Sequence, residues 1–217
     1  MLKNKLQIFV TLMFLSYIVW WVSFQSIVND QGTSVQWFGG TYGLVALLGA
    51  IIGFVTAQKW GGFKTVLGKA LMFFSLGLLA QEAGQLVLTY YAYGLKVEQI
   101  PYPSLGDVAY FGSVILYLLA AFYLAKAVAV KFSLKKTEYK AAAIAIPVVI
   151  LAVSYAVLIR GYSFDTSKPL TVFLDAGYPI GQAFYISVAV VAYLLSRKML
   201  GGVLRSGILL VIFALLL

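Results

Sequence analysis

The chain has 217 residues, of which 62% are apolar and only 11% are charged. Soluble globular domains are closer to half apolar and a quarter charged, so one water-soluble core of this size cannot hide so much apolar surface. The net charge of +9 would suggest nucleic-acid binding in a soluble protein. Basic cytoplasmic loops of a membrane protein explain it better, so we expect the lipid bilayer as partner and no nucleic acid.

The chain contains no Cys and no His. This composition excludes disulfides, Cys/His zinc sites, thiolate nucleophiles, Ser-His-Asp triads and His-ligated haem. A retinal Schiff base would need a Lys inside the helix bundle, and every Lys falls in or near an expected loop. We therefore expect no metal, no cofactor and no enzymatic activity.

Six stretches are long and apolar enough for a spanning helix, which needs about 20 mostly apolar residues. They cover approximately residues 6–28, 37–57, 67–91, 105–128, 141–159 and 170–195. A seventh begins near Gly207, and its eleven residues up to Leu217 cover about half of a hydrocarbon core. We expect an all-α, polytopic transmembrane bundle with six full spans and a truncated seventh, forming a single domain over residues 1–217 that continues beyond Leu217.

The loops between these stretches alternate in charge. One set, which starts with the N-terminal segment, holds 13 of the 16 Lys and Arg residues. The opposite set holds three basic residues and most of the acids: Lys96, Arg160 and Lys168 with Asp30, Glu98, Asp107, Asp165 and Asp175. The positive-inside rule then places the N-terminus in the cytoplasm of a multi-pass protein of the plasma membrane.

Glu82 lies near the middle of the third stretch, between Gln81 and Gln85. A charged side chain at mid-bilayer costs at least ~2.5 kcal/mol and usually faces a bundle interior or a cavity. Gln85 follows three positions later and shares the same helix face. The pair predicts either a ligand, ion or proton site or a protonated Glu that is hydrogen-bonded to a neighbouring helix, because burial can neutralise a lone carboxyl group.

Asp107 follows Pro101 and Pro103, which end any helix upstream of the fourth stretch. Ser104 is a suitable N-cap for that helix, and Asp107 at the third helical position would complete a capping-box-like pattern. An acid there also favours the positive end of the helix. Capping and ligand binding are both open for Asp107.

Asp175, Tyr178 and Gln182 surround Pro179 in the outer part of the sixth stretch. We expect Pro179 to break or kink this helix and so to free backbone carbonyl groups. Broken helices at membrane depth tend to line interiors filled by protein or water. The three side chains are therefore candidates for lining a cavity, and a kink stabilised by ordinary helix packing is the alternative.

Residues 103–110 and 178–185 look alike, since each has a Pro, a turn of small residues, a polar residue and a Tyr-bearing apolar helix. This likeness predicts a repeat of helix pairs, with the third and fourth helices matching the fifth and sixth. Membrane folds built from repeats often place their binding site between the repeats.

Several short segments carry a family resemblance: residues 75–79, Gly84-Gln85, Tyr90-Tyr91, 101–110 and 174–181. With these segments, the stretch from about Leu76 to Leu124 resembles the multi-helix membrane input region in front of GGDEF-type diguanylate cyclases and some sensor histidine kinases. The segment 174–181 looks like that family's second motif, a Tyr-Pro followed by a Gly-Asp, although Gln182 replaces the Asp. The resemblance implies a sensory or signalling membrane module and names no ligand.

The leading hypothesis is a non-enzymatic sensory module with an outer-leaflet ligand site. Ligand occupancy would shift helix packing, and a cytoplasmic signalling effector or a membrane partner subunit would respond. The mid-membrane Glu and the repeat leave a transporter or channel subunit as an alternative. A third is an intramembrane aspartyl protease, because residues 104–107 are similar to a Gly-x-Gly-Asp motif and two carboxyl groups could share a proton. The candidate ligand-binding residues are Glu82, Gln85, Asp107, Asp175, Tyr178 and Gln182.

Overall fold

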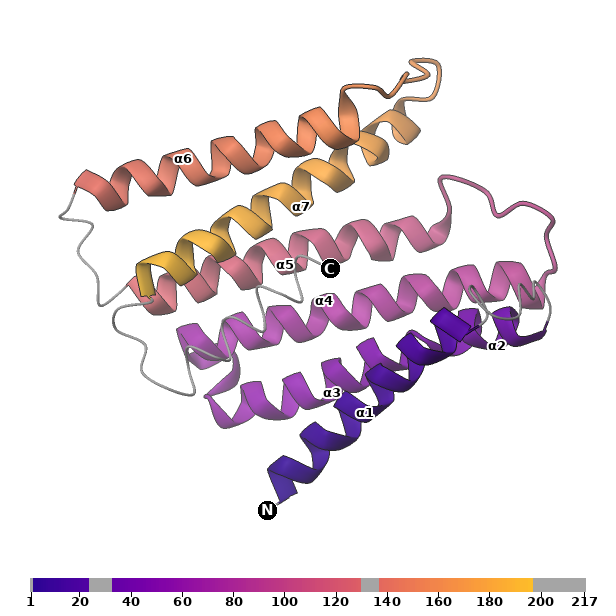
Figure 1. The fold of residues 1–217 in the computed structure, drawn as a ribbon, viewed down its shortest axis with the longest axis horizontal. Helices are drawn as coiled ribbons and strands as arrows, with labels where there is room; N and C mark the ends of the chain where they lie inside the picture. The colour runs from indigo at the N-terminus through magenta and orange to yellow at the C-terminus, as the bar shows by residue number, and fades with distance from the viewer. Residues whose placement is uncertain (1, 24–32, 130–136, 197–217) are drawn as a thin grey trace.

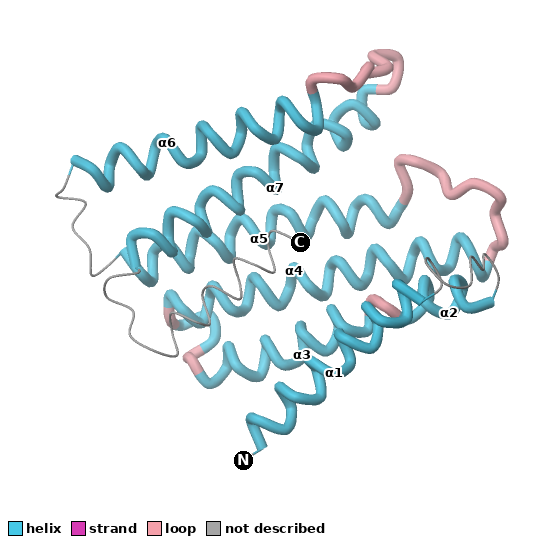
Figure 2. Tube along the Cα trace, in the orientation of Figure 1, coloured by secondary structure: helices cyan, strands magenta, loops and turns pink. Residues whose placement is uncertain are grey.

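The computed structural model describes residues 2–23, 33–129 and 137–196, and every regular element in these ranges is helical (Figures 1 and 2). The α-helices are α1 (Leu2–Ser23), α2 (Thr33–Thr41), α3 (Leu44–Lys59), α4 (Val66–Thr89), α5 (Leu105–Ala129), α6 (Thr137–Ser154) and α7 (Pro169–Ser196). A short 3-10 turn, η2 (Gly62–Lys64), precedes α4, and π-helical turns end α4 and α6 at η3 (Tyr90–Gly94) and η4 (Tyr155–Ile159). The all-α class that the sequence predicts is therefore confirmed.

Four helical segments of the described residues are long and apolar enough to cross a membrane: Val35–Lys59, Val66–Gly94, Leu105–Ala127 and Pro169–Leu194. Two shorter apolar helices, Ile8–Ser23 and Ala143–Ile159, fall within the first and fifth expected spans. The seventh expected span, from Gly207 to Leu217, lies outside the described residues. Such helices are typical of a membrane protein.

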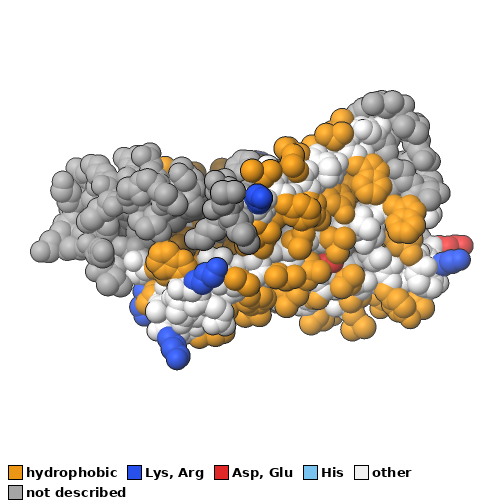
Figure 3. Space-filling view, turned by 90° about the horizontal axis from the view of Figure 1, so that it is seen from below, with side chains coloured by type: hydrophobic (Ala, Val, Ile, Leu, Met, Phe, Trp, Pro, Cys, Tyr) orange, Lys and Arg blue, Asp and Glu red, His pale blue; other side chains and the backbone are white. Residues whose placement is uncertain are grey.

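Large apolar side chains cover the outside of the bundle, as a lipid solvent requires. Val108 and Val157 are 73% and 74% exposed, and hydrophobic side chains cover most of the described surface seen in Figure 3. The same view shows an acidic side chain among the hydrophobic ones, near the middle of this face. Polar groups are therefore present at a depth where the surroundings are apolar.

The helices form a row, and each of α3, α4, α5, α6 and α7 runs opposite to the one before it in the chain, so that the row neighbours α5 and α7 run in the same direction (Figure 1). α4 packs between α3 and α5, α5 packs on α7, and α6 packs on α7 rather than on its sequence neighbour α5. The buried core lies where α4, α5 and α7 meet, at Ala70, Val114, Tyr117, Ala121, Leu124, Tyr185 and Ala189. α1 lies at the other side of the row, against α2 and α3.

The expected helix over residues 37–57 is divided into α2 and α3 by a short turn. Tyr42 N–H still donates to the Phe38 carbonyl at 3.0 Å, and Leu47 N–H donates to the Gly43 carbonyl at 3.1 Å. The backbone of Gly43 is right-handed, with φ −63° and ψ −19°, so this conformation does not require glycine. The reason for glycine is the space beside it, which Glu82 occupies.

Of the two expected effects of Pro179, a break and a kink, the break is wrong, because α7 continues through this residue. A Pro inside a helix removes the hydrogen bond to the carbonyl four residues earlier, here Asp175, and its ring crowds that carbonyl. Packing on α5 supports the rest, because a Cβ atom at Gly181 would lie 2.4 Å from a methyl group of Val114. Segment 178–185 is thus the middle of a helix, whereas residues 103–110 begin ahead of α5. Their similar sequences adopt different local structures.

Candidate functional site

A cavity of about 570 Å³ lies between the first four helices and α5. Its wall is mainly aromatic and aliphatic: Phe14, Tyr17, Ile18, Trp21, Phe38, Tyr42, Gly43, Val45, Ala46, Leu78, Gln81, Glu82, Gln85, Tyr110 and Tyr117. This volume is in the range of small-molecule binding sites, which are mostly apolar with a few placed polar groups. The polar groups of this cavity come mainly from α4.

Glu82 is the charged residue in this wall and is only 5% exposed. It lies near the middle of the apolar segment Val66–Gly94, as the sequence predicts. Its Oε2 atom is buried and has no hydrogen-bond partner among the described residues. A buried polar atom without a partner loses the free energy of its hydration, so it marks a place where a further group can be bound.

The turn between α2 and α3 lies directly against this carboxyl group. A Cβ atom at Gly43 would lie 1.9 Å from Oε2 of Glu82 and 2.9 Å from its carboxyl carbon. Any larger side chain at Gly43 would therefore push the carboxyl group away. The backbone of the turn that divides the expected helix thus lies directly against Glu82, the acid of the described cavity wall.

Gln85 lies one helical turn beyond Glu82 and joins three parts of the fold. Its Oε1 accepts hydrogen bonds from the hydroxyl groups of Tyr42 at 2.6 Å and Tyr110 at 2.8 Å. Its Nε2 donates to the Gly39 carbonyl of α2 at 3.0 Å. The sequence places Gln85 on the face of Glu82, but it gives no signal that Tyr42 and Tyr110 would meet there.

Asp107 forms both a helix cap and a link between helices. Its Oδ2 accepts from the backbone N–H of Ser104 at 2.7 Å and from the Ser104 hydroxyl at 2.9 Å, which confirms the expected capping interaction. Its Oδ1 accepts from the Tyr178 hydroxyl of α7 at 3.1 Å. One carboxylate therefore fixes the start of α5 and connects it to α7.

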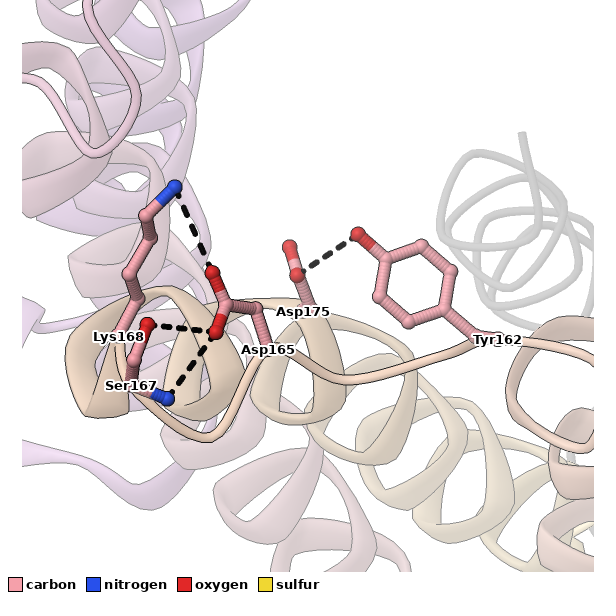
Figure 4. A network of polar contacts seen from close by, with 5 residues as sticks. All are labelled: Tyr162, Asp165, Ser167, Lys168 and Asp175. Atoms are coloured by element: carbon pink, nitrogen blue, oxygen red, sulfur yellow. Dashed lines mark hydrogen bonds and ion pairs between the residues drawn. The ribbon is translucent and has the colours of Figure 1, made fainter.

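Asp175 binds two tyrosines from loops at the same end of the bundle (Figures 2 and 4). It accepts from the Tyr102 hydroxyl at 2.6 Å and from the Tyr162 hydroxyl at 2.9 Å. Burial, together with the bond to Asp175 and its charge, raises the pKa of Tyr102. The bond to Asp175 and its charge also raise the pKa of Tyr162. Both phenols are thus held as hydrogen-bond donors.

A smaller polar group closes the loop before α7 (Figure 4). Asp165 accepts from the hydroxyl of Ser167 at 2.6 Å and from its backbone N–H at 3.1 Å, and Lys168 Nζ lies 3.5 Å from the other carboxylate oxygen. The hydrogen bonds from Ser167 lower the pKa of Asp165. These contacts are exposed turn structure and add nothing to the cavity.

The structure does not bring all six candidate residues to one cavity. Glu82 and Gln85 line it, while Asp107 and Tyr178 bind each other at the end of α5. Asp175 belongs to the loop tyrosines, and the side chain of Gln182 is exposed on α7. The carboxyl groups of Asp107 and Asp175 accept from different donors, so nothing in their hydrogen bonding resembles a pair that shares a proton.

No family model, no curated protein and no solved structure matches this chain. Among the described residues the cavity combines a mainly aromatic wall, an acid with one unpartnered carboxyl oxygen and the hydrogen-bonded side chain of Gln85.

Proposed function

We propose that this chain is a sensory module that binds a ligand in the cavity beside Glu82 and passes a signal to a cytoplasmic effector. The observation that carries the proposal is a cavity of about 570 Å³ with Glu82 in its wall, an acid whose Oε2 atom is buried without a hydrogen-bond partner among the described residues. Ionisable groups within a membrane protein are costly and mark functional sites. A ligand that supplies the missing partner would stabilise the state in which it is bound.

The proposal includes a multi-pass topology in the plasma membrane, with six full spans, a truncated seventh and a cytoplasmic N-terminus. The alternate directions of the helices support it, because they bring the Lys-bearing α3–α4 turn and the end of α5 to one end of the bundle (Figure 1). The loops that carry Glu98 and Asp165 lie at the other end (Figure 2). This separation of charge is what the positive-inside rule describes.

The natural absence of cysteine makes the topology easy to test. Single Lys64→Cys and Gly161→Cys variants would be treated with a membrane-impermeant maleimide in intact cells. We expect labelling of Gly161→Cys in intact cells and of Lys64→Cys only after permeabilisation. Gly161 is suitable because a Cβ atom there meets nothing within 4 Å. The opposite labelling pattern would contradict the proposed orientation of the chain in the membrane.

Hydrogen bonds give a route from the cavity to the rest of the bundle. Gln85 holds Tyr42 and Tyr110, which belong to the α2–α3 turn and to α5. A ligand that moves Glu82 would change these contacts together, and shifts of packed helices are a common means of signalling. The resemblance to cyclase and kinase input regions supports a cytoplasmic effector or partner subunit as the receiver.

Dicyclohexylcarbodiimide tests both halves of this proposal, because this apolar reagent forms a stable adduct with buried protonated carboxyl groups. In lipid nanodiscs we expect an adduct on Glu82 of the wild-type protein. We expect no adduct on helix α4 of the Glu82→Gln variant. The adduct should also change the maleimide labelling rate of Lys64→Cys at the cytoplasmic end. No adduct on Glu82 would contradict ligand access. An adduct that leaves the labelling rate unchanged would contradict signal transmission.

The mid-membrane Glu also fits a transporter or channel subunit. We favour the sensory function because of the resemblance to cyclase and kinase input regions; α7 continues through Pro179, whereas the α2–α3 turn beside the cavity is a helix break of the kind that many transporter sites use. Solute flux into proteoliposomes that exceeds the flux into protein-free liposomes would favour the transporter instead.

A further inference from the structure

Among the described residues, the cavity wall contains an acidic side chain but no basic one. Among its described residues Glu82 is the only carboxyl group, no Lys or Arg faces it, and the chain has no His. A carboxylate in an apolar interior needs a compensating cation, because the loss of hydration is otherwise uncompensated. When Glu82 is ionised, the cation has to come from the occupant.

The shape of the wall is also suited to positive charge. Seven of the lining residues are aromatic: Phe14, Tyr17, Trp21, Phe38, Tyr42, Tyr110 and Tyr117. Tyr17 and Phe38 have ring centroids 5.8 Å apart, and Phe38 stacks on Tyr42 at 5.5 Å, so the rings form a continuous surface. Aromatic faces attract ammonium groups, most strongly where water is excluded.

Most of the tyrosine hydroxyl groups of the wall already donate hydrogen bonds to acceptors of the protein itself. Tyr17 donates to the Thr41 carbonyl at 2.9 Å, and Tyr42 and Tyr110 donate to Gln85. These phenols therefore offer ring surface rather than O–H donors, which an anion would need. An anionic occupant would be repelled by an ionised Glu82, and no Lys or Arg in the described wall would balance its charge.

A divalent metal ion does not suit this wall. Ca²⁺ takes six to eight oxygen ligands and Mg²⁺ takes six. In the ranges 2–23, 33–129 and 137–196 no group of three or more acids could hold a metal ion. A cavity of about 570 Å³ with a mainly apolar wall suits an organic molecule.

We propose that the cavity beside Glu82 binds an organic cation, an ammonium group attached to an apolar body, with Glu82 as counter-ion and the aromatic side chains around it. The proposal rests on the ligand-binding function proposed above and names the chemical class of its ligand. The ammonium group would lie on the side of the Glu82 carboxyl group that lines the cavity, and the apolar body would lie toward α1.

Two probes of the same shape isolate the charge. Benzyltrimethylammonium carries a quaternary nitrogen, and neopentylbenzene has a carbon atom in its place. Binding of each would be measured by tryptophan fluorescence in nanodiscs, since Trp21 lines the cavity. We expect the cation to bind at least about tenfold more tightly than the neutral probe. Glu82→Gln should remove this preference, and Glu98→Gln, at an exposed loop position, should keep it.

The outcomes separate the two proposals. Equal binding of both probes, unchanged by Glu82→Gln, would overturn the cation assignment and leave ligand binding in place. Absence of binding by either probe, together with no carbodiimide adduct on Glu82, would overturn the proposed function as well. If the Glu82→Gln variant does not fold, the test is how well each probe protects wild-type Glu82 from the carbodiimide. The cation should slow the reaction. Equal protection by the neutral probe would contradict the assignment of the ligand as a cation.

Discussion

Gly43 lies so close to Glu82 that a Cβ atom at this position would lie 1.9 Å from Oε2. The α2–α3 turn and the acid of α4 therefore depend on each other. The turn can pack on α4 only because Gly43 has no side chain, and the carboxyl group is buried only because the turn covers it. This contact makes Gly43 the most sensitive position of the α2–α3 turn.

The first prediction concerns Gly43→Ala. The added methyl group cannot fit beside Glu82, so we expect a loss of about 1–3 kcal/mol in the free energy of unfolding. The displaced carboxyl group should also react at a different rate with dicyclohexylcarbodiimide. Gly112→Ala is the matched control, because a Cβ atom at Gly112 meets nothing within 4 Å. It should be neutral or stabilising within a helix, and equal stability of the two variants would contradict the geometry.

The second prediction concerns the node at Gln85. Gln85→Leu removes the acceptor for Tyr42 and Tyr110, and it should cost about 1–3 kcal/mol because two hydroxyl groups, that of Tyr110 partly buried, lose their partner. Replacing both tyrosines with Phe beforehand should reduce this cost. The measurement is a double-mutant cycle on the free energy of unfolding in mixed micelles. Strict additivity would show that the hydrogen bonds contribute nothing to stability.

The third prediction concerns the link between α5 and α7. Tyr178→Phe removes the donor to Asp107 and should cost about 0.6 kcal/mol, which is typical of hydrogen bonds between membrane helices. A cycle with Asp107→Ala should show coupling of the same size. Thr65→Ala removes the N-cap of α4 at the other end of the bundle and should be additive with Tyr178→Phe. Coupling to Thr65 as strong as that to Asp107 would point to a global effect instead.

The fourth prediction concerns alkaline pH. The pKa values of Tyr102 and Tyr162 are raised above the unfolded value of about 10. Their contribution to stability is therefore complete below about pH 10 and is lost as the pH rises through the folded pKa values. Asp175→Asn removes the negative charge, so its loss of stability above about pH 10 should be shallower than in the wild type. Thermal unfolding between about pH 8 and pH 11 measures this, and identical slopes would be evidence against the contact.

Much of the fold follows from hydropathy alone. Each of the six expected stretches coincides with helix in the described residues, because about 20 apolar residues in lipid have few alternatives to a helix. The cap at Ser104 and Asp107 was also predictable, since it depends on residues three positions apart. The break between α2 and α3 was not predicted, and the contact that requires glycine at position 43 comes from the distant Glu82. The sequence also leaves open whether Pro179 breaks or only kinks α7, because the packing of α7 on α5 is again a contact between distant segments.

The site was predictable only in part. Mid-membrane position singles out Glu82, and helical spacing brings in Gln85. The aromatic wall comes from α1 and α2, whose position beside α4 no local pattern specifies. The proximity of Asp175 to Pro179 makes it a candidate for lining the cavity. Its hydrogen-bond donors are instead Tyr102 and Tyr162, which lie in loops. Contacts between distant segments are what a single sequence does not reveal.

Gln85 has no hydrogen-bonding capacity left for a guest. Both lone pairs of its oxygen are occupied by phenols, and its amide hydrogens serve the Gly39 carbonyl and, at 3.4 Å, the Thr89 hydroxyl. Gln85 therefore fastens three segments of the fold together and leaves the recognition of polar groups to other side chains of the wall, such as Gln81 and Glu82. A polar guest that these side chains do not satisfy would lose the free energy of its hydration.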